Sequence, residues 1–98
     1  MSDFYRFPAM ANLGEWTNEQ QADKVRGESL EACNALWDYD MGARFGKPDT
    51  TKRRTAYGME LMDVIHAVET ALRMEFSDAE VGGLRDAVED KNRKRGYY

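Results

Sequence analysis

Two short acidic motifs are the residues of this chain whose types and spacing best fit a chemical role. They are Glu28-x-x-Glu31 and Glu60-x-x-Asp63. Because residues i and i+3 are neighbours on an α-helix, each motif would place both of its carboxylates on one helix face. Like charges at that distance repel one another and lower helix stability. A hard divalent cation, which prefers carboxylate oxygens, would relieve the repulsion, so the pattern predicts a metal site if the two helices pack together.

The same spacing also occurs on ordinary solvated helix faces, and the two motifs by themselves leave that interpretation open. Lys24 precedes Glu28 by one helical turn and would lie at the edge of the same face. On the second helix, Ala67 projects near Glu60, where a small side chain would leave room for a ligand. Glu69 projects about 180° from Glu60 around the helix axis, which predicts an exposed, solvated acid.

The elements that must position these acids are helices with recognisable beginnings. Thr17 with Gln20 has the spacing of a capping box and predicts a helix from about Asn18 to Tyr39 or Asp40. Apolar residues at helical period predict a second helix over 50–76. A second capping box at Ser77 and Glu80 begins a third helix, which has a narrow apolar face.

The intervening residues define the organisation of the chain. Gly42, Gly46 and Pro48 predict a loop between the first two helices. Residues 1–16 show no period and are expected to form an irregular N-terminal arm, followed by one domain over 17–98. No stretch alternates as a strand would. We therefore expect an all-α fold, a bundle of three main helices per protomer that is completed by oligomerisation.

Composition narrows the classes of protein further. The 98 residues carry 18 acids against 14 bases, for a net charge of −4, which argues against general nucleic-acid binding. The single cysteine, Cys33, cannot form an intramolecular disulfide and is expected to be a small buried hydrophobe. No leader-like start and no apolar run of the roughly 20 residues that span a bilayer are present. The expectation is a cytoplasmic protein without a membrane segment.

A third motif gives the acidic pairs a context. Close to the C-terminus lies the motif Lys91-Asn92-x-x-Arg95-Gly96-Tyr97. Together with the two acidic motifs, this ending resembles the MazG-like nucleotide pyrophosphohydrolases. These belong to the all-α NTP pyrophosphatase superfamily, to which dCTP pyrophosphatase and phosphoribosyl-ATP pyrophosphatase are related. The resemblance runs from about Lys24 to Tyr97. One departure is Ser29, where many members carry a second glutamate, but the four metal-facing positions remain filled.

The resemblance implies an enzyme that hydrolyses a nucleoside or deoxynucleoside triphosphate to the monophosphate and pyrophosphate, in control of a nucleotide pool. It implies Mg²⁺ as the cofactor, with Mn²⁺ as an alternative ion, and a homo-oligomer, either a dimer or a tetramer. One of the metal-binding carboxylates would also serve as the general base, and the sequence does not assign which. The implied metal ligands are Glu28, Glu31, Glu60 and Asp63, and the implied substrate-binding residues are Lys24, Lys91, Asn92 and Arg95.

Several alternatives stay open at this point. The basic ending also suits a helix C-terminus, where cations complement the helix dipole. Trp16 could stack on a base or pack onto the first helix, and His66 could orient a ligand or be an ordinary core residue. Phosphoribosyl-ATP pyrophosphatase is the alternative activity. A non-catalytic helical interaction protein, which binds a partner through its apolar stripes, is the alternative of another class.

Overall fold

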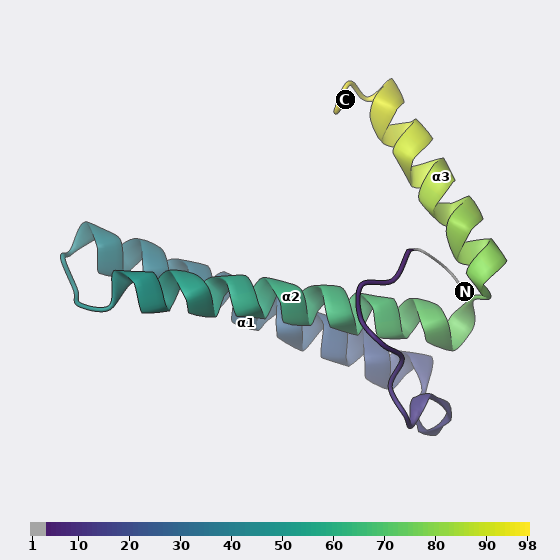
Figure 1. Cartoon of the computed structure of the whole chain (residues 1–98), viewed down its shortest axis with the longest axis horizontal. Coiled ribbons are helices and arrows are strands. Elements are labelled where there is room, and N and C mark those ends of the chain that lie inside the picture. Colours follow the sequence, from purple (N-terminus) through teal and green to yellow (C-terminus); the bar gives the residue numbers. More distant parts are fainter. Residues whose placement is uncertain (1–3) are drawn as a thin grey trace.

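A computed structural model of the chain describes residues 4–98, and these residues form helices joined by short turns (Figure 1). The elements are a 3-10 helix η1, Leu13–Glu15, and the α-helices α1, Asn18–Arg44, α2, Thr50–Glu75, and α3, Asp78–Lys94. The described residues contain no strand, so the prediction of an all-α chain with three main helices is confirmed. None of the described helices is long and apolar enough to cross a membrane.

α1 and α2 lie side by side as a hairpin, and the ends of this hairpin follow from local chemistry (Figure 1). At Thr17 both halves of the predicted capping box are present, since the hydroxyl accepts from the Gln20 N–H and the Gln20 side chain accepts from the Thr17 N–H. The Ser77 capping box of α3 is likewise complete. Each box satisfies backbone donors that the first helical turn leaves unpaired, which fixes where the helix begins.

The end of α1 lies further along the chain than its sequence predicts. The helix continues past Asp40 to Arg44 and includes Gly42, which was expected in the loop. Gly42 is buried because the Arg53 side chain of α2 lies over it, and a Cβ added there would be 3.0 Å from Arg53 Cδ. The turn itself is made by Gly46 and Asp49, both with positive φ. A glycine whose type predicts a helix end therefore lies inside α1 here, at a contact with α2.

Burial is sparse for a chain of this length. Among the described residues the buried hydrophobic side chains are Ala32, Ala67 and Val81. The radius of gyration is 16.6 Å, against about 13 Å for a compact domain of this size. Much of the expected apolar stripe therefore faces outward, with exposed fractions of 39% to 43% at Leu36, Leu61, Ile65 and Val68.

The expectation that Cys33 is buried is wrong for this chain. Ala32 occupies the buried position of α1, with 5% exposure, whereas Cys33 is exposed. Adjacent helical residues project about 100° apart, so only one of the two can face α2.

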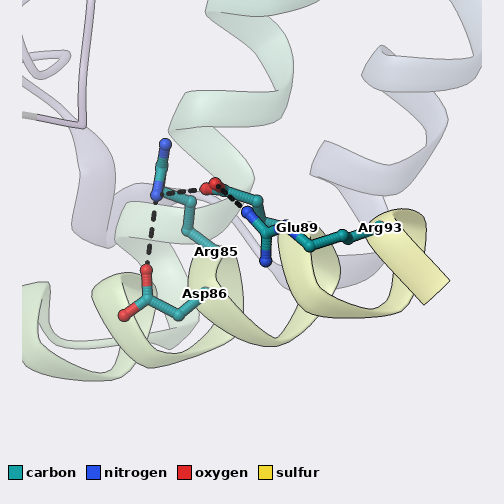
Figure 2. A network of polar contacts seen from close by, with 4 residues as sticks. All are labelled: Arg85, Asp86, Glu89 and Arg93. Atoms are coloured by element: carbon teal, nitrogen blue, oxygen red, sulfur yellow. Dashed lines mark hydrogen bonds and ion pairs between the residues drawn. The ribbon is translucent and has the colours of Figure 1, made fainter. Parts of the chain in front are cut away.

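α3 leaves the α1–α2 hairpin and projects away from it (Figure 1). Its polar face is organised locally rather than by packing (Figure 2). Arg85 contacts Glu89 at 2.8 Å and Asp86 at 3.3 Å, and Glu89 also pairs with Arg93 at 3.1 Å. Exposed pairs of this kind contribute only about 0.3–0.5 kcal/mol each. The apolar face of α3 lies open, with Leu84 44% and Val88 49% exposed.

Candidate metal centre

The packing of α1 against α2 brings the two acidic motifs together. One carboxylate oxygen from each of Glu28, Glu60 and Asp63 can be chosen so that all lie within 4.8 Å of one another. Glu31 lies outside this group, but it is close enough to Glu60 for its charge to raise the pKa of that residue. The structure thus brings three of the four sequence-predicted ligands together, and we call these three residues together with Glu31 the acidic cluster.

Two oxygens of the acidic cluster have no partner that would compensate for their burial. Glu28 is only 9% exposed, and its Oε1 forms an ion pair with Lys24 Nζ at 2.9 Å. The other oxygen, Oε2, is buried without a hydrogen-bond partner, and so is Oε2 of Glu60. An unpaired buried acceptor costs free energy, about 1–3 kcal/mol and more when charged. These oxygens, all from carboxylates, fit a hard cation such as Mg²⁺.

The repulsion among the acids raises the pKa of one of them. The pKa of Glu60 is raised above its ordinary value, first by burial and then by the charges of Glu31, Asp63 and Glu28. The pKa of Lys24 is also raised, chiefly by its hydrogen bond to Glu28 and by that residue's charge. A single ammonium group against four carboxylates leaves the cluster with a surplus of negative charge.

We expect this surplus to appear in the pH dependence of stability without metal. The pKa of Glu60 is raised above its ordinary value of 4.5 in the folded state. Between the ordinary pKa and the raised pKa, the folded chain therefore binds more protons than the unfolded chain. Stability should therefore increase as the pH falls through that window, and the increase should be smaller in Glu60→Gln. Thermal unfolding from about pH 7 to about pH 5 in a chelating buffer measures the difference. Identical pH slopes in the wild type and in Glu60→Gln would contradict the repulsion.

A cavity of about 290 Å³ adjoins the acidic cluster. Its walls come from three parts of the chain, the N-terminal arm, α1 and α2. Ala67 lines it, in agreement with the room that the sequence predicts beside the acids. His66 lines it as well and packs against the Phe7 ring, with 5.1 Å between ring centroids. The remaining lining residues are Met10, Trp16, Gln21, Lys24, Glu28, Asp63 and Thr70.

The predicted substrate-binding residues divide into two groups. Lys24 lies at the acidic cluster, where it pairs with Glu28. Lys91 and Asn92 lie in the last turn of α3, and Arg95 is its C-terminal cap. That end of α3 lies away from the hairpin (Figure 1), and none of the three residues lines the cavity beside the cluster. Within one chain, these basic groups are therefore not part of the site.

The prediction that Glu69 is a solvated surface acid is wrong. Its side chain is buried, because the N-terminal arm crosses that face of α2 and places two backbone N–H groups on the carboxylate. The arm has no periodic pattern from which its position on α2 could be predicted.

Comparison with known proteins does not extend the assignment. No protein-family model matches the chain, and neither a curated protein nor a solved structure is significantly similar to it.

Proposed function

We propose that this protein is a metal-dependent nucleotide pyrophosphohydrolase, which hydrolyses a nucleoside triphosphate to the monophosphate and pyrophosphate. The observation that carries the proposal is the convergence of four carboxylates, two of them with buried and unpartnered oxygens, at the edge of a cavity. A surface acid pair would have both oxygens in water and no cavity beside it. The resemblance of the three sequence motifs to the MazG-like enzymes points to the same chemistry.

The residues of the acidic cluster and Lys24 would have distinct roles in this reaction. Glu28, Glu31, Glu60 and Asp63 would hold Mg²⁺, and the bound ion would neutralise charge on the phosphate oxygens of the substrate. A water oxygen attacks the α-phosphorus, and the bond from that phosphorus to the bridging oxygen of the β-phosphate breaks. A carboxylate of the acidic cluster accepts the proton of the water, and pyrophosphate departs. Lys24, at the edge of the cluster, supplies a positive charge beside the triphosphate.

Identification of the phosphate bond that is cleaved tests this proposal directly. In ¹⁸O-labelled water with Mg²⁺, we expect the label in the monophosphate product and none in pyrophosphate, because attack occurs at the α-phosphorus. Mass spectrometry of the products after incubation with a panel of nucleoside triphosphates makes the measurement, with a chelated sample as the control. Label in pyrophosphate would mean attack at the β-phosphorus. Orthophosphate as the first product, or no product from any triphosphate, would contradict the proposal.

We further propose that the protein works as a homo-oligomer, a dimer or a tetramer. The apolar faces of α2 and α3 are open in the single chain, and exposed apolar surface of this extent is typical of association sites. A second copy could cover these faces and could also bring the basic end of its α3 to the acidic cluster.

A further inference from the structure

The N-terminal arm, residues 4–16, crosses α2 and is fastened there by a buried acid (Figure 1). Glu69 is only 3% exposed. Its Oε2 accepts the backbone N–H of Arg6 at 2.8 Å, and its Oε1 accepts that of Phe7 at 3.0 Å. Both carboxylate oxygens are thus committed to the backbone of the arm, and hydrogen bonds to a charged acceptor are among the stronger ones in proteins.

A second fastening lies one helical turn further along α2. Arg73 Nη2 donates to the carbonyl oxygen of Phe7 at 2.7 Å, and the guanidinium group lies 3.8 Å from the centroid of the Tyr5 ring. The two side chains at positions i and i+4 of α2 therefore satisfy both the N–H and the C=O of Phe7. A segment with no helix or strand of its own gains a fixed register on α2 in this way.

The register of the arm decides how the cavity beside the acidic cluster is closed. At the fastening itself, the Phe7 ring packs on His66, which lines that cavity. Further along the arm, Met10 and Trp16 form part of the cavity wall, which they share with Glu28 and Asp63 of the acidic cluster. The arm thus supplies one side of the space into which a bound substrate would extend.

We propose that Glu69 and Arg73 are positioning residues, which hold the N-terminal arm in place as a wall of the substrate cavity and thereby set how tightly and how selectively the nucleoside part of the substrate is bound. The assignment rests on the proposed function. Glu69 contacts the arm and projects about 180° from Glu60 around α2, so it acts through the arm and not on the phosphates.

The first measurement follows the arm itself. In Glu69→Ala, the amide hydrogen exchange of Arg6 and Phe7 should accelerate by about tenfold or more, because each amide loses a buried hydrogen bond to a charged acceptor. Arg73→Met, which leaves the carboxylate in place, should loosen the arm independently. Glu75→Gln is the matched control, since Glu75 is an exposed acid of α2 that bonds to Asn18 and not to the arm. Unchanged exchange at Arg6 and Phe7 in Glu69→Ala would overturn the fastening.

The second measurement follows the substrate. In both variants, the KM for the nucleoside triphosphate should rise about tenfold with kcat nearly unchanged, and the preference between a purine and a pyrimidine substrate should weaken. Glu69→Gln, which keeps one acceptor oxygen, should lie between Glu69→Ala and the wild type, and circular dichroism confirms that the variants fold.

The outcomes separate the two proposals. A released arm with unchanged KM and unchanged preference would overturn the positioning role while leaving the enzyme proposal intact. If the wild-type protein hydrolysed no triphosphate, the proposed function would be overturned. The proposal that the cavity binds a nucleoside triphosphate would then be overturned as well.

Discussion

Asp63→Asn should abolish turnover while leaving the helices intact. Asp63 provides an oxygen to the acidic cluster from an exposed position on α2, so its exchange for an amide removes a ligand charge without disturbing a packed core. Loss of an outer-shell partner in a metal site typically costs 10- to 100-fold, and we expect loss of a direct ligand to cost at least about 100-fold in kcat/KM. Glu31→Gln should behave alike.

The stability of the same variant should move in the opposite direction. The charge of Asp63 contributes to the raised pKa of Glu60, so the metal-free protein loses repulsion when Asp63 becomes neutral. We expect the Tm of Asp63→Asn in a chelating buffer to equal or exceed that of the wild type, and its increase on addition of Mg²⁺ to be smaller.

Asp40→Asn is the matched control for this prediction. Asp40 is an exposed acid of α1 whose ion-pair partner among residues 4–98 is the exposed Arg44, at 3.4 Å, and it lies outside the acidic cluster. The control should keep wild-type turnover. Wild-type activity in Asp63→Asn would contradict the four-carboxylate site, and loss of helical content would show that the change acts on folding.

Two impaired variants, Arg95→Ala and Asp63→Asn, should recover activity when they are mixed. Arg95 lies at the far end of α3 from the hairpin, so its predicted role at the leaving pyrophosphate requires that it reach the acidic cluster of another copy (Figure 1). Arg95→Ala should then lower kcat as well as raise KM, because the guanidinium would stabilise charge that develops in the transition state. In a dimer of Arg95→Ala with Asp63→Asn, one of the two sites would have an intact acidic cluster together with an intact arginine.

The expected recovery is large enough to measure easily. If subunits exchange at random in an equal mixture, half of the dimers are mixed and half of their sites are intact, which gives about a quarter of the wild-type activity. Arg26→Ala is the control, since Arg26 pairs with the exposed Asp23 on α1 and should leave activity unchanged. Light scattering establishes the assembly. A mass near 11.3 kDa at micromolar concentration, or no recovery after proven exchange, would contradict a shared site.

The local features of this chain could be predicted from its sequence because they depend on residues close together in it. The capping boxes at Thr17 and Ser77 determine where α1 and α3 begin, and both are present as predicted. Once each acidic motif lies on a helix, its i and i+3 spacing puts its carboxylates on one face. Packing of consecutive helices as a hairpin then suffices to assemble the acidic cluster from Glu28 and Glu60 and their neighbours.

Only the tertiary structure decided the features that depend on contacts between distant segments. α1 continues through Gly42, over which the Arg53 side chain lies, although a glycine beside a loop favours a helix end. Glu69 is buried because an arm without periodicity docks on α2 more than sixty residues away in sequence. The direction of α3 separates Arg95 from the acids that it was expected to serve. Periodicity fixes which face a side chain occupies, but it carries no information about which distant segment covers that face.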